Sequence, residues 1–148
     1  MVVVSVIIYR KNNAGYEFLL LKRVPKFGDF WQPPGGRMEE GETKLETAYR
    51  EVLEEAGITK DDILKIHEDI YYFTVLRHYL SDKPLNSVSE QHVMAFEVRP
   101  DTKINIHNNP DSEHEEYKWV DYDTVVKMLK WQNNKDSYEK LKVILKIS

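Results

Sequence analysis

The 148-residue chain contains no cysteine, so disulfide bonds, zinc–thiolate sites and thiol catalysis are excluded. It also lacks a long apolar run, since its most hydrophobic stretch, residues 2–8, is too short to span a membrane and fits a buried strand. Basic charge is not in excess, because 25 acidic and 21 basic residues give a net charge of −4. A strongly basic nucleic-acid surface is therefore not expected. These properties predict one compact domain over residues 1–148, which we expect in the cytoplasm.

Predicted strands and helices alternate along the chain. Runs rich in branched and aromatic residues predict strands at residues 2–10, 16–22, 69–79, 92–98 and 116–120. Helices are predicted at 43–56, 122–131 and 137–147, with a short polar bridge at 60–64. Exposed loops are predicted at 81–89 and 103–111, which are polar and contain proline. This order predicts an α/β fold in which a mixed β-sheet lies between helices.

The most informative segment lies at residues 36–58 and reads GRMEEGETKLETAYREVLEEAGI. Residues 43–56 are rich in helix formers and contain no glycine or proline. At about 100° per residue, one stripe of this helix is typical of a core-facing surface. The stripe consists of Leu45, Ala48, Tyr49, Val52 and Ala56. Glu51, Glu54 and Glu55 fall within an arc of about 100° on a different face.

Three carboxylates on one arc repel each other, and a hard divalent cation relieves that repulsion. Ligands that are all oxygen select Mg²⁺, with Mn²⁺ as a substitute, over softer metals. The plain alternative is a solvated acidic face. The preceding loop, WQPPGGR, favours a metal site, because Gly35 and Gly36 permit unusual backbone angles that aim carbonyl oxygens at a metal. Gly57, directly after the helix, suits a left-handed cap.

These residues match a known pattern, G-x5-E-x7-R-E-U-x-E-E-x-G-U, in which U is aliphatic. Its fixed positions are filled by Gly36, Glu42, Arg50, Glu51, Val52, Glu54, Glu55, Gly57 and Ile58. The chain thus resembles the Nudix hydrolases, and the resemblance implies an α/β/α sandwich. It also implies that Glu51, Glu54 and Glu55 hold the metal together with the Gly36 carbonyl, while Glu42 and Arg50 support the site. Glu42 and Arg50 are about two helical turns apart, so we do not expect them to pair along a straight helix.

Four segments outside this box narrow the resemblance: DFWQ at 29–32, LRH at 76–78, EHEEYKW at 113–119 and KWQNNK at 130–135. They are similar to the dihydroneopterin triphosphate diphosphatases, a subgroup also described as dATP pyrophosphohydrolases. In that subgroup the glutamate matching Glu113 is a metal ligand or general base, although a solvated acidic turn is the plain alternative. Glu90 is a weaker candidate for this extra carboxylate. The double proline at 33–34 and the EHxxYxW element also resemble asymmetric diadenosine tetraphosphate hydrolases, but residues 74–76 occupy the window where those enzymes have a tyrosine.

The implied activity is hydrolysis of a phosphoanhydride, with Glu51, Glu54 and Glu113 as the catalytic carboxylates. The expected substrate is a small polyphosphate, a dATP-like nucleoside triphosphate or a pterin triphosphate, cleaved to monophosphate and pyrophosphate. Diadenosine tetraphosphate hydrolysis is the first alternative. The net charge of −4 disfavours removal of pyrophosphate from RNA 5′ ends, since RNA is a polyanion. The complete box disfavours a non-catalytic nucleotide-binding module. The resemblance allows a homodimer, and neither a membrane nor a nucleic-acid partner is expected.

Candidate substrate contacts lie outside the box. They are Lys22, Arg23, Trp31 and Arg77. The tryptophan would stack on a heterocycle, although packing is an equally common role in such a place. The lysine and the arginines would bind phosphate oxygens, although exposed charges at strand ends are usually solvated. Trp119 and Trp131 are expected to be core or helix-packing residues, and His114 a structural or surface residue.

Overall fold

The computed structural model describes residues 1–77 and 87–147, except for the side chains of Arg77 and Ser87. The elements run in the order β1 (Val2–Asn12), β2 (Gly15–Arg23), η1 (Pro25–Phe27), β3 (Trp31–Gln32), β4 (Gly35–Arg37), α1 (Lys44–Ala56), η2 (Lys60–Asp62), β5 (Ile63–Arg77), β6 (Ser87–Val98), β7 (His114–Val120), α2 (Tyr122–Met128) and α3 (Gln132–Leu145). None of the helices within these two ranges is long and apolar enough to cross a membrane.

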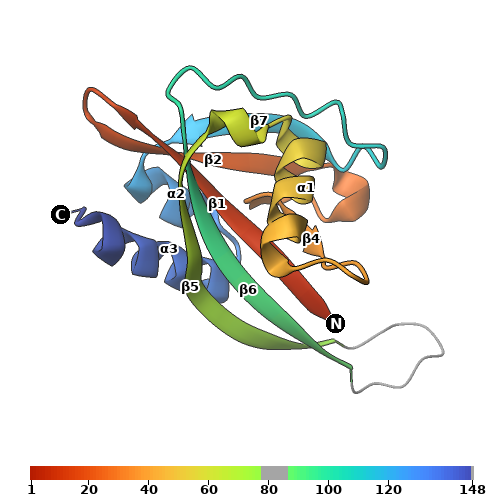
Figure 1. Cartoon of the computed structure of the whole chain (residues 1–148). Helices are drawn as coiled ribbons and strands as arrows, with labels where there is room; N and C mark the ends of the chain where they lie inside the picture. Colours follow the sequence, from red (N-terminus) through yellow and green to blue (C-terminus); the bar gives the residue numbers. More distant parts are fainter. Residues whose placement is uncertain (78–86, 148) are drawn as a thin grey trace.

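Seven strands form one mixed sheet of order β3-β2-β1-β6-β5, with β4 paired to β1 and β7 paired to β2. β1 is antiparallel to β2 and β4 and parallel to β6. Helix α1 covers one face of this sheet, and α2 and α3 cover the other (Figure 1). The predicted α/β architecture, a mixed sheet between helices, is confirmed.

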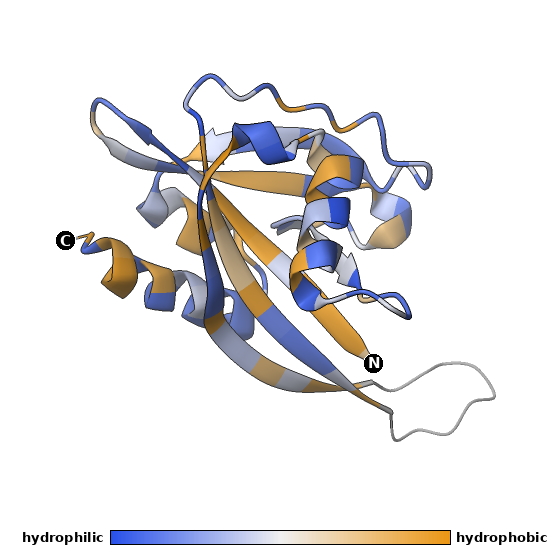
Figure 2. Ribbon diagram, in the orientation of Figure 1, coloured by the Kyte–Doolittle hydropathy of each residue, from blue (hydrophilic) through white to orange (hydrophobic). Residues whose placement is uncertain are grey.

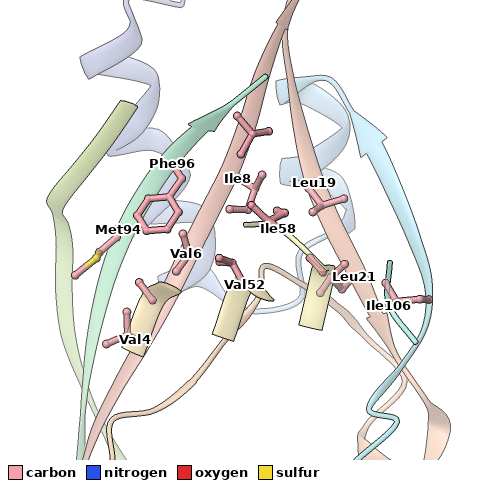
Figure 3. Packing of buried hydrophobic residues seen from close by; sticks show 13 residues of the cluster. Val4, Val6, Ile8, Leu19, Leu21, Val52, Ile58, Met94, Phe96 and Ile106 are labelled. Carbon is pink, nitrogen blue, oxygen red and sulfur yellow. The ribbon is translucent and has the colours of Figure 1, made fainter. Parts of the chain in front are cut away.

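Strand β1 is buried on both of its faces. Val4, Val6 and Ile8 join the cluster beneath α1, whereas Ile7 and Tyr9 join the cluster beneath α2 and α3. Figure 3 shows the first cluster, in which side chains of β1, β2, β6 and α1 interlock. Each large apolar side chain buried in this way stabilises the fold by about 1.5–3 kcal/mol. Figure 2 shows hydrophobic residues along β1 and β2, and an alternation of polar and apolar residues along β5 and β6.

Several element ends differ from the prediction. β5 begins at Ile63 rather than 69, and β6 begins at Ser87 rather than 92, because the two strands pair as one long antiparallel ribbon. Polar residues weakened the strand signal, but several of them, such as Lys65, Glu68 and Asp69, lie at exposed positions, which a sheet with a solvated face tolerates. Helix α2 ends at Met128 and α3 begins at Gln132, so the predicted start at 137 was one turn and a half too late. Residues 78–79 of a predicted strand and 81–86 of a predicted loop lie outside the described part of the chain.

Candidate active site

Helix α1 is capped at both ends by its own sequence. Thr43 Oγ1 accepts a hydrogen bond from the Glu46 N–H at 3.1 Å, and Glu46 Oε1 accepts one from the Thr43 N–H at 2.9 Å. This reciprocal pair is a capping box, which fixes where the helix starts. At the other end Gly57 has φ 70°, which confirms the predicted left-handed cap. The ends of α1 therefore fix which residues face the sheet and which face the glycine strand β4.

The two predicted faces of α1 are both present. Ala48, Val52 and Ala56 are fully buried in the cluster beneath α1, which confirms the core-facing stripe. Glu51 and Glu55 lie against β4 instead. Glu55 is 1% exposed, and its Oε1 accepts a hydrogen bond from the N–H of Gly35 in β4 at 3.0 Å.

Gly36 lies directly against the carboxylate of Glu51. A Cβ at position 36 would collide with both oxygens of that carboxylate. The expectation that Gly35 and Gly36 provide unusual backbone angles is wrong, because neither has a positive φ and both belong to β4. Position 36 must be glycine because the strand and the carboxylate approach too closely for a side chain.

Arg50 joins three parts of the site. Its Nε donates to Glu42 Oε2 at 2.7 Å and its Nη2 donates to Glu42 Oε1 at 3.0 Å. Its Nη1 donates to Glu51 Oε1 at 2.7 Å, and its Nη2 also donates to the carbonyl of Arg37 at 2.9 Å. The expectation that Glu42 and Arg50 do not pair is wrong, because Glu42 precedes the N-cap Thr43 and the chain turns back along the helix. The two hydrogen bonds from Arg50 lower the pKa of Glu42 to about 2.

The three box glutamates differ in their surroundings. Glu51 is almost fully buried, and burial raises its pKa although the neighbouring Arg50 opposes that shift. Glu54 is the accessible one, because its side chain is 40% exposed and its Oε2 lies 3.5 Å from Arg50 Nη1. Burial raises the pKa of Glu55 well above its usual range, and the nearby carboxylates of Glu51 and Glu113 raise it further. A cation in this position would favour the ionised forms of Glu51 and Glu55.

Glu113, directly before β7, and His114, the first residue of β7, both approach Glu55. One ligand atom from each of Glu55, Glu113 and His114 lies within 4.8 Å of the others. Among the described residues Glu55 Oε2 and His114 Nδ1, which are 4.0 Å apart, have no hydrogen-bond partner although both are buried. A buried carboxylate oxygen without a donor is costly in a protein interior unless a cation satisfies it. The buried Glu55 oxygen, on the same helix as the carboxylates of Glu51 and Glu54, therefore fits a hard divalent cation.

Gln32 determines which nitrogen of His114 carries the proton. The Gln32 amide nitrogen Nε2 lies 3.0 Å from His114 Nε2, and an amide nitrogen is only a donor. His114 Nε2 is thus the acceptor, and the ring proton is on Nδ1, which faces Glu55 Oε2. Burial lowers the pKa of His114 to about 4, with a contribution from Arg23, so the ring is neutral at pH 7. The expectation that His114 is structural agrees with its burial, but it also connects Gln32 to a box glutamate.

The carboxylates open into a cleft of about 1030 Å³. One group of its lining residues, the carboxylate wall, consists of Gly36, Arg50, Glu51 and Glu54. A second group, the aromatic wall, consists of Phe30, Phe73, Trp131, Asn133 and Asn134. Glu113 and Arg23 also line the cleft. The volume is at the top of the range of about 300–1,000 Å³ that is usual for sites enclosing a small molecule.

The candidate substrate contacts divide between the two faces of the sheet. Arg23 lines the cleft, and its Nη2 lies 3.9 Å from Glu113 Oε2. Lys22 points to the other face and is held by Asp29 at 3.4 Å and Glu115 at 3.2 Å. Trp31 is the cross-strand partner of Lys22 and packs against the cluster beneath α2 and α3 instead of lining the cleft formed by the described residues. Neighbouring residues of a strand point to opposite faces, which is why these adjacent candidates separate.

Two other candidates stay outside the site as described. The side chain of Arg77 lies outside the described part of the chain, although its backbone ends β5. Glu90 accepts a hydrogen bond from the Tyr72 hydroxyl at 3.3 Å and is absent from the described residues that line the cleft. Glu113, which does line it, is the better placed of the two candidates for the extra carboxylate.

The aromatic wall contains residues that sequence reasoning placed elsewhere. Trp131 was expected to pack in the interior, but it is 51% exposed and lines the cleft. The expectation for Trp119 is confirmed, since it packs against the cluster beneath α1 with the Arg10 guanidinium 4.0 Å above its ring. The segment KWQNNK carried the available signal, because polar residues flank Trp131 on both sides at the start of a helix.

Known proteins resemble this chain over most of its length. It is 35% identical to the asymmetrical bis(5′-nucleosyl)-tetraphosphatase of Caenorhabditis elegans, over 84% of this chain and 81% of that protein. It is 28% identical to the RNA pyrophosphohydrolase of Pelagibacter ubique, over 96% and 91%. It is also 27% identical, over 93% of its length, to an octanoyltransferase of Myxococcus xanthus, of which it spans only 35%.

Solved structures share the fold. A protein from Listeria monocytogenes described as a NUDIX hydrolase superposes with a TM-score of 0.82 at 28% identity, covering 99% of this chain and 94% of that one. The dihydroneopterin triphosphate pyrophosphohydrolase of E. coli superposes with a TM-score of 0.75 at 25% identity, covering 97% and 95%. The NUDIX domain family itself matches residues 1–141. With the complete box in sequence and two of its glutamates, Glu51 and Glu54, lining the cleft, the chain belongs to the Nudix family of hydrolases.

Proposed function

We propose that this protein hydrolyses a phosphoanhydride of a nucleoside or pterin triphosphate, releasing monophosphate and pyrophosphate. One observation carries the proposal: Glu51, Glu54 and Glu113 line a single cleft with Gly36, and the buried Glu55 Oε2, on the same helix as Glu51 and Glu54, has no hydrogen-bond partner among the described residues. Neighbouring carboxylates repel one another, and a bound cation would offset that repulsion. A triphosphate needs the same cations, because its own charge would otherwise be repelled by the acidic wall.

The residues that would hold Mg²⁺, or Mn²⁺ as a substitute, are Glu51, Glu54, Glu55 and the Gly36 carbonyl. The metal when bound would neutralise phosphate charge and acidify a bound water. Arg50 keeps Glu51 oriented through a 2.7 Å hydrogen bond, while Glu42 holds Arg50 from the other side. This pairing lets a buried carboxylate stay in place before any ligand arrives.

Glu113 and Arg23 are the groups whose positions suit proton transfer and phosphate binding. Glu113 directly precedes β7, so it is not part of the helix that would hold the metal, and its lone pairs remain free to accept a proton from water. Arg23 Nη2 is 3.9 Å from Glu113, too long for a strong bidentate pair, and its Nε has no partner among the described residues. A phosphate oxygen would satisfy this guanidinium better than the distant carboxylate does.

Asymmetric hydrolysis of a dinucleoside tetraphosphate is the second candidate. It is supported by the 35% identity to the C. elegans tetraphosphatase, and the cleft has room for a second phosphate-bearing group. The resemblance to an RNA pyrophosphohydrolase makes RNA 5′ ends a third substrate to test, although the net charge of −4 disfavours a long polyanion. All three candidate reactions would use the same carboxylates, so the candidates differ in substrate and not in chemistry.

The deciding experiment is a hydrolysis panel with products resolved by chromatography. The protein would be given Mg²⁺ and, separately, dihydroneopterin triphosphate, dATP, ATP, diadenosine tetraphosphate and a triphosphorylated RNA. Monophosphate plus pyrophosphate, formed fastest from the pterin or dATP, would support the first candidate. ATP plus AMP from diadenosine tetraphosphate as the fastest reaction would move the protein to the second. If the intact protein in Mg²⁺ released product from no substrate faster than the Glu54→Gln variant does, both candidates would be refuted.

A further inference from the structure

We propose that Trp131 is the platform on which the aromatic ring of the substrate stacks. The inference deepens the proposed function, on which it rests, by assigning the ring-binding end of the cleft. Trp131 is 51% exposed, although its backbone is fixed at the start of α3. The Trp131 carbonyl accepts hydrogen bonds from the Asn134 N–H at 3.1 Å and the Lys135 N–H at 3.2 Å. Because the backbone is already fixed, little additional conformational entropy is lost when a ligand covers this large side chain.

Neighbouring side chains hold the indole ring without covering it. Phe30 meets it edge-on, with ring centroids 6.4 Å apart and an angle of 82° between the planes. The Lys130 ammonium lies 4.8 Å from the indole centroid and 5.8 Å from the Phe30 ring. These contacts restrict the rotamer of Trp131 and add a cation beside it. The indole is thus preorganised, and half of its surface remains available.

The cleft connects this platform to the carboxylates. Trp131 and the carboxylate wall line the same cleft, so a ligand with polyphosphate at one end and a flat ring at the other would meet both groups. Asn133 and Asn134, which also line it, offer amide donors and acceptors of the kind that pair with the edge of a heterocycle. The chemical class that fits is an aromatic heterocycle carrying a phosphate chain, a purine or a pterin.

The other tryptophans of the chain provide matched controls. Trp31 packs against the cluster beneath α2 and α3, under the Lys118 ammonium at 5.2 Å, and Trp119 packs against the cluster beneath α1. Neither is among the described residues that line the cleft. A ligand that stacks in the cleft would therefore change the fluorescence of Trp131 and leave that of the other two nearly constant.

The test measures binding, not turnover. The intact protein, Trp131→Phe, Trp131→Leu and the control Trp31→Phe would be titrated with α,β-methylene-dATP in Mg²⁺, following tryptophan fluorescence and, independently, heat. Inorganic tripolyphosphate, which has no ring, would be titrated by heat alone. We expect the intact protein and Trp31→Phe to show quenching, and Trp131→Phe to bind with nearly unchanged Kd but without quenching. Trp131→Leu should raise the Kd of the nucleotide about tenfold and leave that of tripolyphosphate within about twofold.

Three results would overturn the inference. They are absence of quenching in the intact protein, an unchanged nucleotide Kd in Trp131→Leu, and an equal loss of nucleotide and tripolyphosphate binding in that variant. The proposed function fails separately: ring-dependent binding without hydrolysis in the substrate panel would leave Trp131 as the platform of a binding site. Hydrolysis with ring-independent binding in Trp131→Leu would keep the enzyme and remove the platform.

Discussion

The carboxylate wall and the aromatic wall line one cleft but are constructed differently. Every member of the carboxylate wall comes from β4 or α1, and Arg50 ties Glu51 to the segment before the helix. The aromatic wall is assembled from β5, from the start of α3 and from the loop before β3. Its largest member, Trp131, is half exposed, whereas Glu51 is nearly buried. The first wall is thus rigid before a ligand binds, and the second has surface left for one.

This difference separates chemistry from selectivity. Buried and cross-bonded carboxylates suit a reaction whose geometry must not vary, because small displacements at a reacting centre cost large factors in rate. Exposed rings and amides suit contacts that change from one substrate to another. We therefore expect substitutions in the carboxylate wall to lower kcat on every substrate, and substitutions in the aromatic wall to change the relative KM values. The predictions that follow test this division, from the largest expected effect to the smallest.

Glu54→Gln should have the largest effect, because it removes a charge at the reacting centre. We expect kcat to fall by about 10²–10³-fold on every substrate. The side chain is 40% exposed, so the free energy of unfolding should be unchanged. Steady-state kinetics and urea denaturation measure the two quantities. Glu139→Gln, an exposed glutamate on α3, is the control, and near-normal activity in Glu54→Gln would contradict the metal assignment.

Gly36→Ala tests the close approach between β4 and Glu51. The added methyl group would meet the carboxylate, so we expect a loss of about 10- to 100-fold in kcat/KM and about 1–3 kcal/mol in the free energy of unfolding. Gly41→Ala is the control, because its φ of 86° is strained for alanine but no atom lies within 4 Å of the new Cβ. A similar loss of activity in both variants would show that loop strain, and not the collision with Glu51, is responsible.

Gln32→Leu tests whether the amide orients His114 toward Glu55. Without the donor the imidazole can place its proton on either nitrogen, and Glu55 loses an ordered neighbour. We expect the Kd for Mn²⁺, measured by calorimetry, to rise about tenfold with little change in stability. Gln132→Leu, an exposed amide at the start of α3, should leave the Kd unchanged. Equal Mn²⁺ affinity in both variants would limit His114 to packing.

Glu42→Gln should give the smallest effect, seen in the pH dependence of stability. The pKa of Glu42 falls from an ordinary 4.5 to about 2 on folding, so its pairing with Arg50 stabilises the fold fully above pH 4.5. That contribution is lost as pH falls toward 2. The urea midpoints of Glu42→Gln and the intact protein should therefore differ most at pH 7 and converge only near pH 2. A constant difference at both pH values would show that the ion pair does not contribute.

What could be predicted from the sequence was local. The ends of α1, its core-facing stripe and the arc of glutamates follow from helical spacing and from capping residues a few positions away. The pairing of Glu42 with Arg50 was missed because helical spacing was applied to a residue that precedes the helix. Glycine at position 36 was predicted for the wrong reason, since a close tertiary contact leaves no mark in a dihedral preference.

The positions of residues outside the box could be assigned only from the arrangement of the sheet. Lys22 and Arg23 are adjacent in sequence, and only the strand register shows that Arg23 faces the cleft. Trp31 packs beneath α2 and α3, whereas Trp131 lines the cleft. Which tryptophan is covered depends on how α2 and α3 dock on the sheet, and a short segment does not encode that docking.

The central position of β1 has a consequence for how the chain folds. β1 is synthesised well before its parallel partner β6, which begins only at Ser87, and its two faces are covered by α1 on one side and by α2 and α3 on the other. Val4, Val6 and Ile8 can be covered by α1, which is synthesised before β6, but Ile7 and Tyr9 pack beneath α2 and α3, which are synthesised last. Pairing between strands so distant in sequence is slow, and an apolar strand left waiting is prone to aggregate. We expect yield in cells to depend on synthesis temperature and on chaperones more strongly than the equilibrium stability of the folded protein would indicate.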